Sequence, residues 1–336
     1  MNAMSIYSRA TGRWLRPSEV EINKPGRGEV LVRVKVCGVC RTDLHVVEGD
    51  LGKTIPGLIP GHEAIGRVVE TGEGVTILRQ GDMVGVPWLH STCGICEYCS
   101  TGRENLCCRK TFTGYTVNGG FAEYVCALES FVIPIDKGMR PESAAPLLCS
   151  GIIGYRAFKL ARPAPGGAIG LFGFGASAHI TLQVATALGY SVHVMSRNPE
   201  HLKLAMRLGA TTAFQTDGEI PLSISRGSMD AAIVFAPSGS VVRLALECVK
   251  AGGSVAVPAI HMDGIPALDY EKQLFHEKRL FSVEANTRAD ALEFMRLAKR
   301  IKIRSKIKEF ALKDANEALS ELKQGKINGA AVLRIT

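Results

Sequence analysis

The sequence predicts a two-domain α/β protein, in which a mostly β domain accompanies a domain built on a doubly wound parallel sheet. The chain has 336 residues, enough for two domains that each bury a core. Residues 168–195 contain an apolar strand, a glycine turn, a helix with apolar spacing and a second strand, which together form a βαβ unit. Residues 28–86 instead show short strands separated by turns and no helical periodicity, so we expect the β domain there.

The composition is typical of a globular protein. The chain is 46% hydrophobic and 21% charged, which excludes the disordered class. No apolar run reaches membrane-spanning length, and the N-terminal residues lack the apolar segment of a signal peptide. We therefore expect a cytoplasmic protein without a membrane partner.

The net charge of +8 raises the question of a nucleic-acid partner. The strongest basic run is KRIKIRSKIK, at residues 299–308, where isoleucines alternate with charged residues. This alternation is typical of a half-buried edge strand, and no aromatic residues are interleaved for stacking on bases. We expect no nucleic acid as a partner.

Potential metal ligands follow the first long strand, which we predict over residues 28–39. Cys40 stands at its end and His62 follows a tract rich in proline and glycine, which predicts a loop before a strand at residues 64–69. Thiolate and imidazole are ligands that zinc takes, and Glu63 adjoins the histidine. A catalytic zinc site needs about three protein ligands, so a third residue must come from elsewhere.

Ten cysteines occur in the chain, and several crowd into one polar segment with the spacing C-x2-C-x2-C-x7-C, formed by Cys93, Cys96, Cys99 and Cys107. Without a secretory signal, this crowding favours metal-bound thiolates over disulfides. Four thiolates at this spacing predict a closed, structural zinc site. An iron–sulfur cluster is the alternative metal group, and Cys108 is an alternative fourth ligand.

Cys149 lies among small and apolar residues that we predict to be helical. A single buried cysteine is ordinarily part of a core. Here it is a candidate for the third ligand beside Cys40 and His62.

The glycine turn predicts a dinucleotide site. Gly173 and Gly175 fill the first two glycine positions of G-x-G-x-x-G/A, and Ala178 is the permitted variant of the third. The second strand ends on Ser196 and Arg197, where an acid would bind the ribose 2'-hydroxyl of NAD. We favour NADP(H) over NAD(H), with Arg197 binding the 2'-phosphate; stacking on adenine or a plain surface charge are its alternative roles.

Further strands predicted at residues 231–235, 254–257 and 280–283 complete the parallel sheet. A helix at 288–300, the basic strand, a short helix near 315–323 and a last strand at 330–335 follow. This tail most simply rejoins the first domain.

These motifs together resemble the zinc-containing medium-chain alcohol dehydrogenases over almost the whole chain. GVCRTDLH, GHE, the four-cysteine run, LLCSG and the glycine turn occur in the order of that family. The resemblance implies a GroES-like catalytic domain at residues 1–147 and 287–336, around a Rossmann dinucleotide-binding domain at 148–286. It also implies two zinc ions per chain and a homodimer or homotetramer.

The resemblance also assigns roles. Cys40, His62 and Cys149 would hold the catalytic zinc, with Glu63 as a nearby acid. Asp43 would orient His62. Thr42 would relay the substrate proton through the cofactor ribose to His45. Further family positions correspond to residues that would contact cofactor or substrate: Arg41 at the pyrophosphate, and Leu51 and Trp88 in the substrate pocket.

The implied reaction is hydride transfer between a primary alcohol or aldehyde and the nicotinamide, with zinc as a Lewis acid. Leu51 stands where relatives that prefer small alcohols carry tryptophan, so we expect a roomier pocket. A polyol, cinnamyl-alcohol or other secondary-alcohol dehydrogenase is the alternative on the same scaffold. A zinc-ribbon protein that binds nucleic acid is a remote alternative, since it leaves the glycine turn unexplained.

Overall fold

The computed structural model describes residues 1–8, 13–216 and 226–336, and these divide into two compact units. The first comprises residues 1–150, 285–295 and 305–336, and the second comprises 151–284 and 296–304. Residues 296–304 therefore cluster with the second unit, whereas the sequence placed them in the catalytic domain. They include the last turns of α9 (Arg288–Ile301), which begins in the first unit.

The first unit is mostly β, as the sequence predicts. Its strands are β1 (Asn2–Ile6), β2 (Leu15–Glu19), β3 (Glu29–Val39), β4 (Ala64–Thr71), β5 (Met83–Val86), β6 (Leu89–Ser91), β7 (Thr111–Phe112), β8 (Tyr124–Leu128), β9 (Ile133–Pro134), β16 (Ile307–Ala311) and β17 (Ala330–Arg334). Its helical segments are α1 (Arg41–Glu48), α2 (Glu97–Ser100), η1 (Glu104–Leu106), α3 (Pro141–Ala144), η2 (Ala145–Leu148), η3 (Leu312–Asp314) and α10 (Ala315–Lys323).

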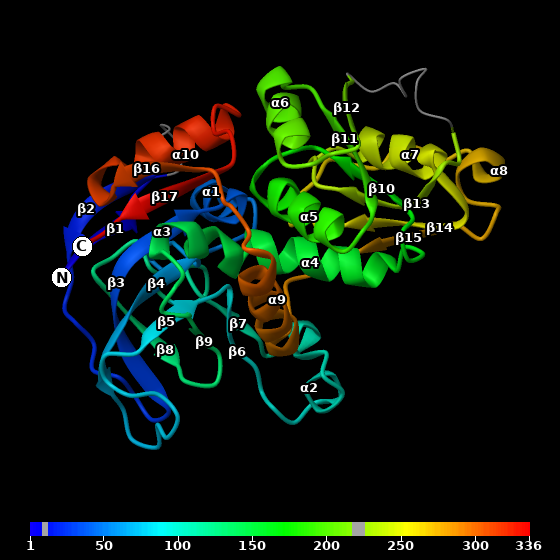
Figure 1. Ribbon diagram of the computed structural model, residues 1–336. Helices are drawn as coiled ribbons and strands as arrows, with labels where there is room; N and C mark the ends of the chain where they lie inside the picture. Colours follow the sequence, from blue (N-terminus) through cyan, green and yellow to red (C-terminus); the bar gives the residue numbers. More distant parts are fainter. Residues whose placement is uncertain (9–12, 217–225) are drawn as a thin grey trace. The chain divides into compact units, whose positions relative to one another are not determined.

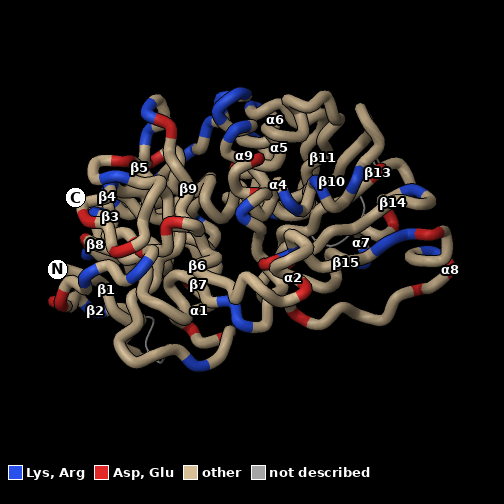
Figure 2. Tube along the Cα trace, turned by 90° about the horizontal axis from the view of Figure 1, so that it is seen from below, with Lys and Arg blue, Asp and Glu red and all other residues tan. Residues whose placement is uncertain are grey.

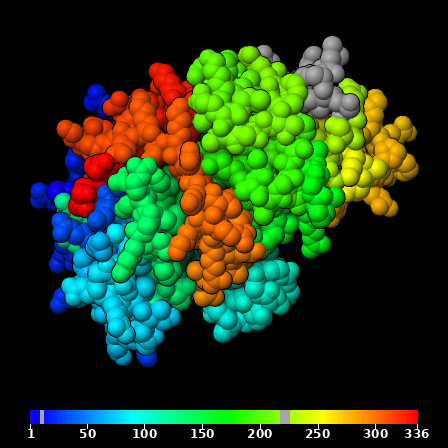
Figure 3. All heavy atoms as spheres, viewed as in Figure 1, coloured from blue at the N-terminus to red at the C-terminus, as the bar shows by residue number. Residues whose placement is uncertain are grey.

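Strand β3 organises this unit. Its sheet has the order β16-β17-β3-β4-β5-β9, and β8 also pairs with β3. The C-terminal segment from β16 to β17 lies beside the N-terminal strands in Figures 1 and 3, because β17 pairs antiparallel with the end of β3. The tail thus rejoins the first unit, as predicted.

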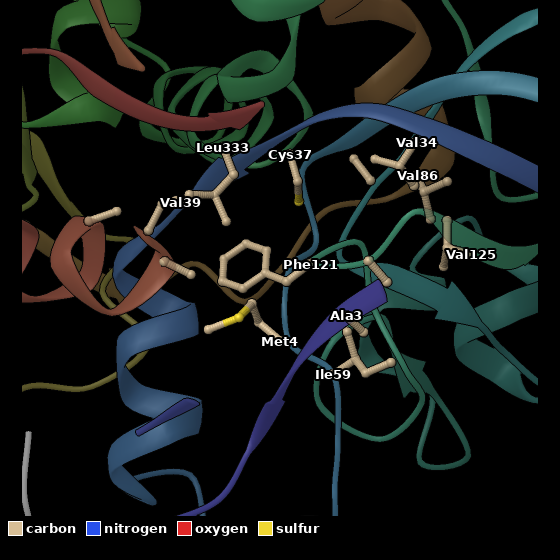
Figure 4. Packing of buried hydrophobic residues seen from close by; sticks show 14 of the residues in the cluster. Ala3, Met4, Val34, Cys37, Val39, Ile59, Val86, Phe121, Val125 and Leu333 are labelled. Atoms are coloured by element: carbon tan, nitrogen blue, oxygen red, sulfur yellow. The ribbon is translucent and has the colours of Figure 1, made fainter. Parts of the chain in front are cut away.

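The core of this unit surrounds Phe121, which is fully buried. Figure 4 shows its ring among side chains from β1, β3 and β17, including Met4, Cys37 and Leu333. Burying a phenylalanine side chain contributes about 1.5–3 kcal/mol. This packing holds the end of β3 in place, and Cys40 follows that end directly.

The second unit contains a six-stranded sheet in the order β12-β11-β10-β13-β14-β15, and all its pairs are parallel. The strands are β10 (Ala168–Phe172), β11 (Ser191–Ser196), β12 (Thr212–Gln215), β13 (Met229–Val234), β14 (Val249–Val257) and β15 (Arg279–Ser282). The helices are α4 (Ser150–Ala161), α5 (Ala176–Ala187), α6 (Pro199–Arg207), α7 (Gly239–Cys248) and α8 (Tyr270–Gln273). The strand order reverses between β10 and β13, which confirms the predicted doubly wound fold.

Three local predictions were wrong. Residues 41–48, where no helix was expected, form α1, because Asp43 caps the helix start and Gly49 ends the helix in the left-handed conformation, with φ 87°. The basic run at 299–308 is not one strand: α9 extends to Ile301 and β16 begins only at Ile307. Cys149 lies between η2 and α4, not inside a helix.

Basic and acidic residues are interspersed along the chain in Figure 2. Some of them form ion pairs, such as Lys250 with Asp230. No helix among the described residues combines the length and the apolar character needed to cross a membrane.

Candidate metal and cofactor sites

The first group of potential metal ligands is brought together by the pairing of β3 with β4. Cys37 lies opposite Ala64 in this antiparallel pair. Cys40, just beyond β3, and His62, just before β4, therefore lie at the same end of the two strands. Cys149, after η2, completes the group. The ligand atoms of Cys40, His62, Glu63 and Cys149 all lie within 4.8 Å of one another, and the two sulfurs are 3.9 Å apart. All four residues belong to the first unit.

His62 is fully buried, and its two ring nitrogens differ in their surroundings. Nδ1 lies 2.7 Å from Oδ1 of Asp43, whereas Nε2 makes no hydrogen bond within the part of the chain that the structure describes. A buried imidazole nitrogen without a partner is costly unless it binds something. Beside two thiols, Nε2 fits a zinc ion, for which nitrogen and sulfur ligands are the usual donors.

Asp43 ties this group together from α1. Its carboxylate accepts hydrogen bonds from the backbone amides of Cys40, at 2.8 Å, and Gly61, at 3.1 Å, in addition to facing His62. The contact with Nδ1 fixes the tautomer that leaves Nε2 free to bind a metal. The position of Asp43 at the third residue of α1 follows from the capping of that helix.

Burial and neighbouring charge shift the titration of these groups. Burial lowers the pKa of His62, but the charge and hydrogen bond of Asp43 outweigh this effect and raise the pKa well above its usual value. The hydrogen bond with Cys149 is the main cause that holds the pKa of Cys40 well below that of an ordinary thiol. Cys40 is therefore the more acidic of the two thiols, in the thiolate form that metals bind.

Glu63 is buried beside these ligands and is held by Ser150. Its Oε1 accepts hydrogen bonds from the Ser150 amide, at 3.2 Å, and hydroxyl, at 3.1 Å. Burial raises the pKa of Glu63 well above its usual value, and the charge of Cys40 raises it further. Gly38 makes room for the carboxylate, because a Cβ there would lie 1.9 Å from Oε2 of Glu63. No sequence motif predicts this role of Gly38.

Thr42 and His45 lie three residues apart on α1 and are both 8% exposed, so they share one face of the helix. His45 Nδ1 lies 2.7 Å from Oδ2 of Asp50, whose amide also donates to the His45 carbonyl at 3.0 Å. Asp50 was missed because its place beside His45 depends on α1 and its glycine C-cap, neither of which we predicted.

An aromatic stack borders the same histidine. The Trp88 ring meets the His62 ring edge-on, with centroids 4.9 Å apart, and stacks on Phe112 at 4.6 Å. Tyr115 continues the stack 6.0 Å from Trp88. Leu51 packs against the buried cluster that contains Trp88. The two predicted pocket residues thus share one apolar cluster next to His62.

The four cysteines of the second group also converge. The sulfurs of Cys93, Cys96, Cys99 and Cys107 all lie within 4.8 Å of one another. Backbone amides point at them: Cys96 N lies 3.4 Å from the Cys93 sulfur and Arg109 N lies 3.4 Å from the Cys107 sulfur. Hydrogen bonds from the Ile95 and Cys96 amides lower the pKa of Cys93 to about 5. Cys108 is exposed and outside this group.

The predicted nucleotide-binding residues lie in the second unit, except Arg41, which is the exposed first residue of α1. Gly173 follows β10 with φ 89°, and a Cβ there would lie 2.8 Å from the Ala236 amide. Gly175 caps α5, with open space where its side chain would be, and Ala178 is fully buried in that helix. The turn therefore leaves its backbone accessible at the helix N-terminus, the geometry that suits a pyrophosphate.

Ser196 ends β11 and is 8% exposed, while the Arg197 side chain is exposed. The Ser196 hydroxyl accepts a hydrogen bond from the Asn198 amide and lies 3.5 Å from Nδ1 of His201. His201 was not among the predicted residues, although it follows Arg197 by one helical turn.

Comparison with known proteins agrees with this arrangement. Residues 26–137 match the family model of the alcohol dehydrogenase GroES-like domain, and residues 178–300 match that of the zinc-binding dehydrogenases. The chain is 45% identical over 319 residues to "Probable alcohol dehydrogenase AdhA" of Mycobacterium tuberculosis (strain CDC 1551 / Oshkosh), covering 94% of this chain and 91% of that protein. It is 39% identical to an alcohol dehydrogenase of Geobacillus stearothermophilus, covering 96% of each.

Among solved structures, the cinnamyl alcohol dehydrogenase SbCAD4 of Sorghum bicolor superposes with a TM-score of 0.91 at 28% identity, covering 99% of this chain and 97% of that one. The two-domain α/β fold and the family resemblance are thereby confirmed. The chain belongs to the zinc-containing medium-chain alcohol dehydrogenases and is an NAD(P)-dependent oxidoreductase.

Proposed function

We propose that this protein transfers a hydride between a primary alcohol or aldehyde and NADP(H), with a catalytic zinc held by Cys40, His62 and Cys149. The observation that carries the proposal is the buried Nε2 of His62, which is oriented by Asp43 and adjoins two thiols. Two cysteines and one histidine leave a fourth position open for substrate. Zinc bound there would polarise the substrate oxygen and make its hydroxyl more acidic.

Proton movement is assigned to α1. Thr42 would accept the hydroxyl proton of the alcohol, and His45 would receive it by way of the cofactor ribose. Asp50 accepts a hydrogen bond from Nδ1–H of His45, so Nε2 of that ring is the basic nitrogen. The carboxylate would also keep the imidazole oriented while Nε2 takes up the proton, before water takes it away.

Glu63 would stay beside the metal ligands as the nearby acid that can approach the ion during ligand exchange. This proposed role is supported by the burial of Glu63 and by its two hydrogen bonds with Ser150. Burial raises the pKa of Glu63 and so favours its neutral form, whereas a cation next to the carboxylate would favour the ionised form.

The four-cysteine group would hold a second, structural zinc. Four sulfurs saturate a tetrahedral ion and leave no position for substrate, so this site would stabilise its lobe and take no part in the reaction. The amide hydrogen bonds to the sulfurs support the thiolate form.

The preference for NADP(H) rests on the end of β11. Ser196 and Arg197 place a hydroxyl and a guanidinium where an acid would select the free ribose hydroxyl. A guanidinium suits a 2'-phosphate because it presents several donors in one plane. The imidazole of His201, next to Ser196, is a further donor at this position.

A second candidate substrate class is the aryl or cinnamyl alcohols. It is favoured by the stacked Trp88 and Phe112 rings beside His62, because aromatic side chains next to the proposed metal ligands would suit a conjugated substrate. One structural relative, at 28% identity, is itself called a cinnamyl alcohol dehydrogenase.

A substrate and cofactor panel tests these proposals. The zinc-loaded protein should reduce short, long and aromatic aldehydes, and should use NADPH with a higher kcat/KM than NADH. A steady fall of kcat/KM from ethanol to hexanol and benzyl alcohol would exclude the roomier pocket. Equal use of NADPH and NADH would exclude the proposed cofactor preference, and failure with every alcohol and aldehyde would reject the function itself.

A further inference from the structure

Tyr115 connects two parts of the apolar cluster next to His62. Its ring belongs to the aromatic stack with Phe112 and Trp88, and its hydroxyl donates a hydrogen bond to the backbone carbonyl of Leu51. Tyr115 and Leu51 are 64 residues apart in the sequence. This single hydroxyl therefore joins the segment that carries the stack to the segment that follows α1.

The segment that carries Tyr115 is fixed by its own hydrogen bonds. The Phe112 amide donates to Oγ1 of Thr116 at 2.6 Å, and the Thr116 amide donates back to the Phe112 carbonyl at 3.0 Å. Gly114 has φ 74°, and a Cβ on it would lie 2.8 Å from the Gly61 amide. The turn thus packs on the backbone next to His62 and provides a firm base for the Tyr115 hydroxyl.

The segment that receives this hydrogen bond is a tight turn after α1. The amide of Asp50 donates to the His45 carbonyl at 3.0 Å, and that of Gly52 donates to the Gly49 carbonyl at 3.0 Å. Leu51 stands between these two anchored amides, and its side chain packs against the cluster of Val46, Leu58 and Trp88. The Leu51 carbonyl has its partner in Tyr115, so the hydroxyl fixes the turn from the side of the stack.

We propose that Tyr115 is a positioning residue that holds Leu51 against the cluster containing Trp88, in the proposed substrate pocket, and thereby strengthens selection of bulky over small alcohols. The inference rests on the proposed function for its catalytic consequence, but the contact itself lies wholly within the first unit. A bulky substrate gains apolar contact from Leu51 only where that side chain is held in place, whereas ethanol is too small to depend on it.

The variant Tyr115→Phe separates the hydrogen bond from the ring, because phenylalanine keeps the stack. Losing one neutral hydrogen bond corresponds to about a 2- to 10-fold effect. We expect the ratio of kcat/KM for benzyl alcohol to that for ethanol to fall by about this factor, through a higher KM for benzyl alcohol at nearly unchanged kcat. Tyr270→Phe is the matched control, since Tyr270 is 61% exposed and lies in the second unit.

Amide hydrogen exchange of the zinc-loaded protein provides a test that needs no activity. In Tyr115→Phe the amides of residues 50–52 should exchange faster than in the wild type, with unchanged exchange in β3 and unchanged zinc content. Equal exchange overturns the positioning role. Faster exchange with an unaltered substrate ratio overturns the specificity role. If the wild type oxidises no alcohol, the proposed function fails, and the exchange experiment alone decides whether Tyr115 positions Leu51.

Discussion

Oδ1 of Asp43 lies 2.7 Å from Nδ1 of His62, and both side chains are fully buried. The same carboxylate accepts hydrogen bonds from the amides of Cys40 and Gly61. Asp43 therefore fixes the tautomer of His62 and also anchors the backbone at Cys40 and Gly61.

Replacing Asp43 by asparagine should weaken zinc binding at this group. The variant retains a polar side chain but loses the charge that favours Nδ1–H of His62, and changes of this kind cost about 10- to 100-fold in metal affinity. Competition with a chelator measures the effect. Asp50→Asn, at a carboxylate that faces His45 instead, should leave zinc affinity unchanged. Unaltered affinity in Asp43→Asn would show that the contact does not support the metal.

The four-cysteine group predicts a separate, structural role. Cys96→Ser should remove one zinc per chain and lower the melting temperature, because the lobe from Cys93 to Cys107 depends on the ion for its conformation. Metal analysis combined with thermal unfolding checks this prediction. Cys108→Ser is the matched control, since Cys108 adjoins the group without belonging to it. A full zinc content in Cys96→Ser would contradict the assignment.

Arg197→Ala should affect one cofactor and not the other. Losing a charge-assisted contact with the 2'-phosphate is expected to raise the KM for NADPH about 10- to 100-fold, while the KM for NADH stays nearly constant. Arg207→Ala removes the same charge from the C-terminal end of α6 and serves as the control. An equal loss with both cofactors would assign Arg197 to adenine stacking or to general structure.

His179 predicts a dependence of stability on pH. The side chain is fully buried in α5, neither ring nitrogen has a hydrogen-bond partner among the described residues, and burial lowers its pKa to about 4. In the unfolded chain the pKa is near 6.5, so between about pH 6.5 and 4 the unfolded state binds more protons. The free energy of unfolding should therefore be fully retained above pH 6.5 and fall by about 2 kcal/mol on acidification to pH 5.

Urea unfolding of the second unit at pH 7 and pH 5 measures this loss. His179→Gln, which cannot take up a proton, should show a smaller decrease than the wild type by about 2 kcal/mol. His193→Gln is the comparison variant. It should reduce the decrease by less than His179→Gln does, because His193 is only partly buried and hydrogen-bonds Thr212. The same decrease in the wild type and in His179→Gln would exclude His179 as the source.

The parts of this protein that sequence reasoning recovers are those with a local signal. The βαβ unit around Gly173 carries its own periodicity and turn residues, and valines alternate with Arg33 and Lys35 in the strand before Cys40. The apolar strands with helices between them predict five of the six strands of the parallel sheet, and only β12 (Thr212–Gln215) was not predicted. These signals are independent of distant contacts, which is why they predict the fold class.

The missed features depend on tertiary contacts or on helix ends. The capping of α1 by Asp43 was not predicted, because cysteine is an unusual N-cap residue. Without α1, the position of Asp50 beside His45 could not be predicted either. Isoleucines that alternate with charges in the run at residues 299–308 suit a strand, yet α9 continues into the run as far as Ile301. The next residue, Lys302, has φ 55° and does not continue the helix. The hydrogen bond from Tyr115 to Leu51 and the fit of Glu63 against Gly38 join residues far apart or on different elements, and no sequence pattern encodes them.

The most direct test of the central claim is zinc analysis of the wild type and of Cys149→Ala, with dehydrogenase activity measured on the same samples. Cys126→Ser serves as the control, because Cys126 lies outside both metal groups. We predict two zinc ions per chain in the wild type and in Cys126→Ser, and one zinc with no dehydrogenase activity in Cys149→Ala. Two zinc ions and full activity in Cys149→Ala would contradict the proposed catalytic site.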